Sequence, residues 1–126
     1  MNYNQKRNIL IVDDDKDALA MIEEVLLYLD FNVQGLQYPH DIFGMIRDYK
    51  PDLVLMDYIL TGINGGELCH QIKTNPQTAD IPVILISAYP KVLESLGRYG
   101  CDAFIAKPFN ISDLISRING CFHATT

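Results

Sequence analysis

The chain has 126 residues, of which 48% are hydrophobic, so it is long enough and apolar enough to fill one core. It carries 16 Asp and Glu against 10 Lys and Arg, and a net charge of −6 argues against a nucleic-acid-binding surface. No apolar stretch approaches the roughly 20 residues that cross a bilayer, so we expect a cytoplasmic protein without a membrane anchor. Cys69, Cys101 and Cys121 show no CxxC spacing and predict reduced, partly buried thiols.

Short apolar runs alternate with amphipathic segments from one end of the chain to the other. Runs of this kind, bounded by polar or turn residues, predict strands that are buried on both faces of a parallel sheet. They are Ile9–Val12, Val33–Leu36, Leu53–Met56, Val83–Ile86 and Ala103–Ala106.

Apolar residues recur with helical spacing between and after these runs. Pro39 suits a first helical turn, and Asn110, three residues before Asp113, suits a helix N-cap. Five alternations of strand and helix predict an α/β fold, with a parallel sheet between two layers of helices. The expected helical segments are Ala18–Leu29, Ile42–Tyr49, Leu68–Ile72, Lys91–Tyr99 and Ile111–Phe122, of which the fourth has the weakest pattern.

Polar residues with complementary chemistry follow the predicted strands, where open α/β sheets bind their ligands. Two carboxylates about 4 Å apart repel by roughly 4 kcal/mol at an effective dielectric near 20, so a divalent cation such as Mg²⁺ is expected among them. An Asp beside such a metal can act as a nucleophile and form an aspartyl phosphate, whose oxygens an amine and a hydroxyl could contact. The residues concerned are Asp13, Asp14 and Asp15 after the first run, then Asp57, Ser87 and Lys107.

Four segments resemble the sequence blocks of response-regulator receiver domains. Leu10–Asp15, Asp52–Asp57, Ile84–Ala88 and Lys107–Phe109 occur in the right order and at nearly the right spacing. The resemblance covers about residues 8–122 and implies a CheY-like, doubly wound (βα)5 fold with the flavodoxin-like strand order 2-1-3-4-5. It also implies one stand-alone receiver domain over residues 1–126, with no effector domain.

The resemblance implies a role for each site residue. Asp57 corresponds to the phosphoacceptor, Lys107 to the invariant lysine, and Asp15 is expected only to begin a helix. Ser87 corresponds to the switch hydroxyl and Phe104 to a switch aromatic that moves inward after phosphorylation, while the Lys107–Pro108 peptide is expected to be cis. The implied Mg²⁺ ligands are Asp13, Asp14, Asp57 and the backbone carbonyl of Ile59.

The expected partners follow from the same resemblance. A histidine kinase or a histidine phosphotransfer protein would donate the phosphoryl group, and a downstream protein would read the outcome. Neither nucleic acid nor membrane is expected as a partner. The chain would be a phosphoacceptor in two-component signalling rather than an enzyme, although with Mg²⁺ it would phosphorylate and dephosphorylate itself.

Several positions depart from the family pattern. Thr61 stands where proline is most frequent, and Pro90 precedes the fourth predicted helix. The spacing from Ser87 to Lys107 is also short, so we expect the fourth helix to be shortened or irregular. Ile59 and Tyr89 occupy positions that tune hydrolysis of the phosphoryl group, and their bulk predicts slow self-hydrolysis.

Two other classes of protein fit less well. A binding module that signals without phosphorylation tends to lose one residue of the set that is intact here. An Asp-nucleophile phosphatase expects a D-x-D-x-T/V motif, whereas Asp57 is followed by Tyr58-Ile59-Leu60. A flavodoxin-like electron carrier expects a Ser/Thr-rich loop after the first strand, where this chain has three carboxylates that would repel a flavin phosphate.

Overall fold

The protein is built around one parallel sheet. The computed structural model describes residues 6–60, 62–89 and 99–123. The strand order is β2-β1-β3-β4-β5, which confirms the flavodoxin-like order, and no strand end differs from the predicted bounds by more than one residue. The strands are β1 (Asn8–Val12), β2 (Asn32–Leu36), β3 (Leu53–Asp57), β4 (Val83–Ser87) and β5 (Ala103–Ala106).

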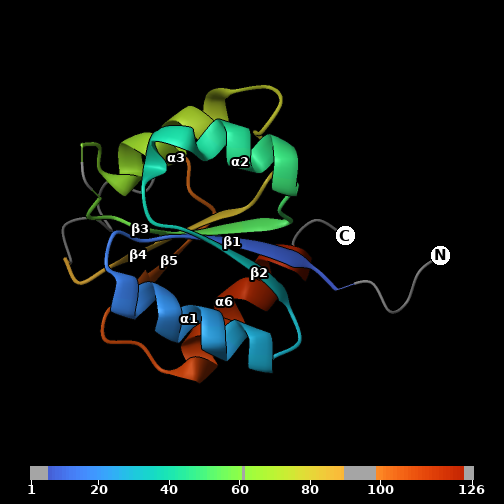
Figure 1. Ribbon diagram of the computed structural model, residues 1–126, viewed down its shortest axis with the longest axis vertical. Helices are drawn as coiled ribbons and strands as arrows, with labels where there is room; N and C mark the ends of the chain where they lie inside the picture. Colours follow the sequence, from blue (N-terminus) through green and yellow to red (C-terminus); the bar gives the residue numbers. More distant parts are fainter. Residues whose placement is uncertain (1–5, 61, 90–98, 124–126) are drawn as a thin grey trace.

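Helices cover both faces of the sheet (Figure 1). On one face lie α2 (Ile42–Tyr49), which follows a 3-10 turn at Pro39–Asp41, and α3 (Gly65–Thr74). On the other face lie α1 (Lys16–Tyr28) and α6 (Ile111–His123). The predicted fourth helix falls, apart from Tyr99, outside the described residues.

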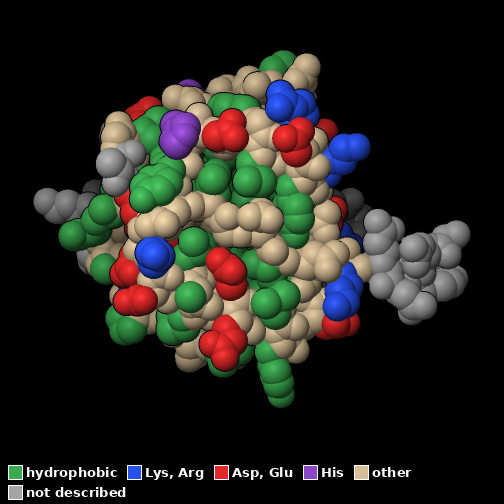
Figure 2. All heavy atoms as spheres, in the orientation of Figure 1, with side chains coloured by type: hydrophobic (Ala, Val, Ile, Leu, Met, Phe, Trp, Pro, Cys, Tyr) green, Lys and Arg blue, Asp and Glu red, His purple; other side chains and the backbone are tan. Residues whose placement is uncertain are grey.

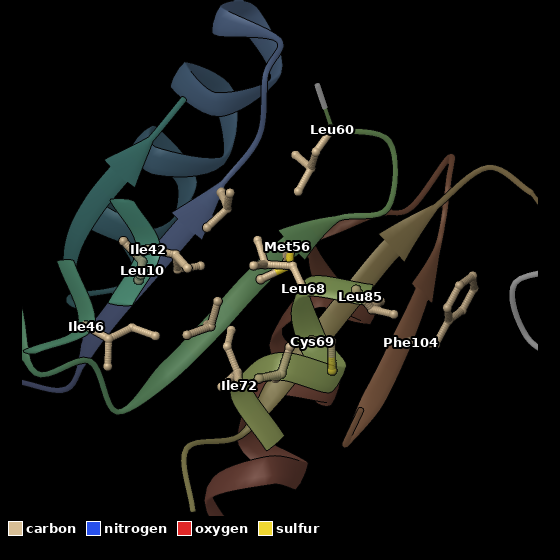
Figure 3. Packing of buried hydrophobic residues seen from close by; sticks show 13 residues of the cluster. Leu10, Ile42, Ile46, Met56, Leu60, Leu68, Cys69, Ile72, Leu85 and Phe104 are labelled. Carbon is tan, nitrogen blue, oxygen red and sulfur yellow. The ribbon is translucent and has the colours of Figure 1, made fainter. Parts of the chain in front are cut away.

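The pleat of each strand divides the core into two apolar layers, because successive side chains point to opposite faces. Leu10 and Val12 pack towards α2 and α3, as Figure 3 shows for Leu10, whereas Ile9 and Ile11 pack towards α1 and α6. Strands β1, β3 and β4 are buried along almost their whole length. Strand β2 lies at an edge and is exposed or half-buried throughout, so the prediction of burial on both faces is wrong for this strand.

Side-chain caps begin three of the helices where the sequence favours them. The carboxylate of Asp15 accepts from the amides of Asp17 and Ala18 at the start of α1. Asn64 Oδ1 accepts from the amide of Glu67 over 2.8 Å at the start of α3. The expected Asn110 cap is confirmed, since its side chain accepts from the amide of Asp113 over 2.8 Å. These caps satisfy amides that the first helical turn leaves without a partner.

The surface agrees with the acidic composition. Among the described residues on the face shown in Figure 2, Lys and Arg side chains are interspersed with Asp and Glu and do not form one basic patch. Within the described part of the chain, no helix is long and apolar enough to cross a membrane.

Candidate functional site

The carboxyl ends of β1, β3, β4 and β5 bring the predicted site residues to one edge of the sheet. Backbone hydrogen bonds continue the parallel ladder beyond the last strand residues there. The amide of Tyr58, directly after Asp57, donates to the Ile86 carbonyl over 2.9 Å, and the Lys107 amide donates to the Ser87 carbonyl over 2.9 Å. Neighbouring strands therefore fix the backbone that carries the site side chains. The Lys107–Pro108 peptide is cis, as expected.

The Asp57 carboxylate is the buried centre of this edge, with 8% of the residue exposed. Lys107 Nζ lies 2.7 Å from Asp57 Oδ1, and the Ile59 amide donates to Oδ2 over 3.0 Å. The lysine contact lacks the alignment of a hydrogen bond and acts through charge. An unpaired carboxylate is costly to bury. The positive charge of Lys107 therefore offsets much of the free-energy cost of burying Asp57.

Asp13 is the second buried carboxylate, with only 3% of the residue exposed. Its Oδ1 accepts from the Asp15 amide over 2.9 Å, which links the site to the start of α1. Burial raises the pKa of Asp13, and the negative charge of Asp57 adds to the rise. Asp14 is half-buried, whereas Asp15 is exposed and caps α1, as expected.

Ser87 and Phe104 complete the set of predicted switch residues. Ser87 is 3% exposed, and its Oγ accepts from the Tyr89 amide over 3.0 Å. Phe104 is 7% exposed and belongs to the buried cluster between the sheet and the α2–α3 layer (Figure 3). The ring of Phe104 is therefore buried on the α2–α3 side of the sheet.

The pattern of polar burial singles out this edge. The polar side chains buried among the described residues are Asp13, Asp57, Ser87 and Thr78. Thr78 lies elsewhere and is satisfied, because its hydroxyl donates to the Ile72 carbonyl over 2.6 Å. The other three lie at the carboxyl ends of three adjacent strands, Asp13 directly after β1 and Asp57 and Ser87 as the last residues of β3 and β4. Buried carboxylates oppose folding unless they are paired, so their concentration here indicates a functional site.

The donor set suits a hard divalent cation. Carboxylate oxygens are preferred ligands of Mg²⁺, which keeps several waters and usually takes one or two protein carboxylates. Burial, and to a lesser extent the negative charge of Asp57, raises the pKa of Asp13. No three His, Cys, Asp or Glu side chains among the described residues form a preassembled metal cage. Asp13 and Asp57 are the buried carboxylates that this edge offers to such an ion.

Gly65 is a site residue that the sequence analysis did not single out. A Cβ atom at this position would collide with the backbone oxygen of Asp57. The Gly65 amide donates to the Tyr58 carbonyl over 2.6 Å, so the first residue of α3 rests directly on the chain that carries Asp57. The Gly65-Gly66 pair shortly before the predicted helical segment Leu68–Ile72 was the available signal, because glycine permits such close backbone contact.

A parallel sheet with buried carboxylates and an apposed lysine at its carboxyl edge defines a class of α/β signalling domain. Residues 9–119 match the family model of the response regulator receiver domain. The chain therefore belongs to the response regulator receiver family, whose members are signalling phosphoacceptors of two-component systems rather than classical enzymes.

Individual relatives agree with this assignment. The chain is 32% identical over 124 residues to the phosphate regulon transcriptional regulatory protein PhoB of Pseudomonas aeruginosa, covering 94% of this chain and 53% of PhoB. It is 32% identical over 112 residues to the response regulator ArlR of Staphylococcus aureus, covering 87% of this chain and 50% of ArlR. The chain thus spans about half the length of these curated relatives.

Solved structures share the fold. A putative response regulator from Chloroflexus aurantiacus superposes with a TM-score of 0.87 at 26% identity, covering 94% of this chain and 99% of that one. The response regulator TrrA of Thermotoga maritima, solved in complex with Mg²⁺ and BeF, gives a TM-score of 0.83 at 23% identity, covering 91% and 98% of the two chains.

Proposed function

We propose that Asp57 is the phosphoacceptor of this receiver domain and takes a phosphoryl group from a phosphohistidine. The contact between Asp57 Oδ1 and Lys107 Nζ, 2.7 Å apart at a buried sheet edge, is the observation that carries this proposal. A carboxylate oxygen attacks the phosphorus in line while the histidine nitrogen leaves. Lys107 then stabilises the negative charge of the phosphoryl oxygens, and the Ser87 hydroxyl would donate a hydrogen bond to one of them.

The acidic residues of the edge would hold Mg²⁺ in this reaction. We assign the ion to Asp13, Asp14, Asp57 and the backbone carbonyl of Ile59, which together supply oxygen ligands. When bound, Mg²⁺ neutralises charge that develops on the transferred group. Asp13 has a separate role, because its Oδ1 accepts from the Asp15 amide and so keeps the acidic loop in place against the sheet.

A protein donor is supported by the surface beside Lys107. An open hollow of about 430 Å³ lies between α1 and the segment after β5, and Met21, Pro108 and Phe109 are among its lining residues. Met21 is 55% exposed there. We assign this surface to a histidine kinase or a histidine phosphotransfer protein, because a donor seated on it is next to Lys107 and hence to Asp57. The phosphorylated chain would then act on a downstream protein through contact.

Intact-protein mass after incubation with acetyl phosphate and Mg²⁺ tests the acceptor. We expect one phosphoryl addition that requires the metal and is absent from Asp57→Asn. Asp80→Asn, which removes an exposed carboxylate from another part of the chain, is expected to be labelled as the wild type is. No addition to a folded protein that binds Mg²⁺ would instead favour a module that signals without phosphorylation.

A second substitution separates the donor surface from the chemistry. Met21→Asp is expected to react normally with acetyl phosphate, because this small donor needs no apolar contact. The same variant should lose labelling by an autophosphorylated histidine kinase that labels the wild type. Equal loss with both donors would place the effect of Met21 in the site itself rather than in docking.

A further inference from the structure

One face of α3 packs along the segment that leads into β5. Gly66, Cys69 and Lys73 lie three and four residues apart and therefore share this face. A Cβ atom on Gly66 would collide with the ring of Tyr99, and Lys73 Nζ forms an ion pair with Asp102 Oδ2 over 3.0 Å. We call this contact, between Gly66, Cys69 and Lys73 on α3 and residues 99–102, the α3 seam.

Two thiols meet inside the α3 seam. Cys69 Sγ donates to the Tyr99 carbonyl oxygen over 3.7 Å, and Cys101, two residues after Tyr99, packs against the same buried cluster as Cys69. Cys69 is fully buried between α3 and the sheet (Figure 3), whereas Cys101 is partly exposed. Both thiols are free in this structure. The buried sulfur thus has a partner that a small molecule can reach from solvent.

We propose that Cys69 and Cys101 are a redox-active pair that closes a reversible disulfide across the α3 seam. Neither residue takes part in the phosphoryl chemistry of Asp57, so this site is additional to the acceptor. Cys69 and Cys101 belong to one packed cluster, and the Lys73–Asp102 ion pair holds the two backbones together beside them. Reversible oxidation requires one accessible thiol with a resolving thiol next to it, and the seam supplies both.

The proposed oxidant is a small-molecule disulfide such as glutathione disulfide. The Cys101 thiolate attacks one sulfur of the oxidant, whose S–S bond breaks, and the first small thiol leaves with the proton that Cys101 lost. Cys69 then gives up its proton and attacks the Cys101 sulfur of the mixed disulfide, which releases the second small thiol. The protein loses two electrons and two protons, and the oxidant becomes two thiols.

The environments of the two sulfurs support this order of attack. Interaction with the neighbouring Cys69 thiol lowers the pKa of Cys101, so the partly exposed thiol forms the thiolate more readily. Interaction with the Cys101 thiol, together with burial, raises the pKa of Cys69. Cys101 is therefore the attacking residue and Cys69 the resolving one.

The bond would fix α3 to the start of β5. An S–S bond of about 2.05 Å is shorter than the separation of two free thiols, so the segment around Cys101 must move towards α3. Cys101 lies two residues before β5, the strand that carries Phe104 and is followed by Lys107. Because the cross-link also restricts the unfolded chain, the oxidised protein is expected to unfold at a higher temperature than the reduced one.

The test compares the folded 126-residue chain with Cys69→Ser, Cys101→Ser and Cys121→Ser after exposure to glutathione disulfide. Cys121 is the matched control, because it is buried in the other core layer, on α6. Intact mass and peptide mapping should show the loss of two hydrogens and a Cys69–Cys101 cross-link in the wild type and in Cys121→Ser. Cys69→Ser should stop at one glutathione adduct on Cys101, and Cys101→Ser should stay unmodified. Dithiothreitol should reverse each product.

Three results would contradict the proposed disulfide between Cys69 and Cys101. They are a glutathione adduct that persists on wild-type Cys101, a cross-link that involves Cys121 or a second chain, and no reaction of the folded protein under conditions that oxidise it in urea. Labelling of Asp57 by acetyl phosphate is measured in parallel on the reduced protein, so failure of the thiol pair and failure of the phosphoacceptor are read separately.

Discussion

The middle and the carboxyl end of the same strands are buried to nearly the same degree but differ in chemistry. Leu55 is fully buried on β3, and Asp57, two residues later, is 8% exposed. Leu85 is fully buried on β4, and Ser87, two residues later, is 3% exposed. Burying apolar area lowers the free energy of the fold, whereas burying a carboxylate raises it. Burial at the strand ends therefore opposes stability at the place where the phosphoryl chemistry is proposed.

The largest expected effect comes from the apolar middle. Leu85→Ala should lower the free energy of unfolding by about 2–5 kcal/mol, because it removes a fully buried side chain and leaves a cavity. Ser87→Ala on the same strand removes one hydrogen bond, to the Tyr89 amide, and should cost only about 1 kcal/mol. Urea unfolding measures both. Equal losses would show that the strand end contributes to stability as the middle does.

Lys107 compensates part of the charge at the strand ends. In metal-free buffer, Lys107→Met should lower the free energy of unfolding by about 1–2 kcal/mol, between the usual values for exposed and buried pairs, because 33% of its side chain is exposed. In an Asp57→Asn background the same substitution should cost almost nothing. If the loss is the same in both backgrounds, the stabilisation by Lys107 comes from packing and not from Asp57.

The predictable features are those set by regular geometry. Strand bounds and the meeting of Asp13, Asp57, Ser87 and Lys107 follow from apolar runs and from the rule that parallel strands end at one edge. The α3 seam could not be predicted from the sequence, because Cys69 lies on a helix and Cys101 in a loop, and the contact between them depends on tertiary packing rather than on periodicity. The spacing of the two cysteines along the sequence did not predict a common role for them.

The side-chain position of Phe104 could not be predicted from the sequence either. A Phe between core residues is compatible with either an inward or an outward side chain, and only packing decides between them. The structure places it in the α2–α3 layer. The collision that makes Gly65 necessary is likewise tertiary, since it involves the Asp57 backbone. Asp15 was predictable as a cap because capping depends only on neighbouring residues.

The free-energy cost of burying the Asp13 carboxylate can be measured through the pH dependence of stability. Because burial raises its pKa, the folded state binds a proton more tightly than the unfolded state does. Its contribution to stability is therefore fully present below the unfolded pKa of 3.8 and is lost as pH rises through the raised folded pKa. Asp13→Asn should stabilise the metal-free protein at pH 7 by about 1 kcal/mol, and by less as pH falls towards 4.

Asp14→Asn is the matched variant for Asp13, because its carboxylate is adjacent in sequence but only half-buried. Thermal unfolding in chelator should show a smaller gain for this variant, and both variants should bind Mg²⁺ more weakly than the wild type. A lower melting temperature for metal-free Asp13→Asn, or a gain that does not change with pH, would contradict the assignment of that cost to a buried charge.

The smallest expected effect on stability lies at the rim of the site. Ile59 and Tyr89 are 54% and 53% exposed, and their amides donate to the side chains of Asp57 and Ser87. Ile59→Asn should change stability by less than about 0.5 kcal/mol, as exposed positions usually do, yet shorten the phosphoryl lifetime several-fold by admitting water. Ile111→Asn, on an equally exposed isoleucine of α6, is the control. A phosphoryl lifetime of seconds in the wild type would contradict the hypothesis that Ile59 and Tyr89 hinder the access of water. A long lifetime that Ile59→Asn shortens would mean that this apolar rim protects the acyl phosphate from water while adding nothing to the stability of the fold.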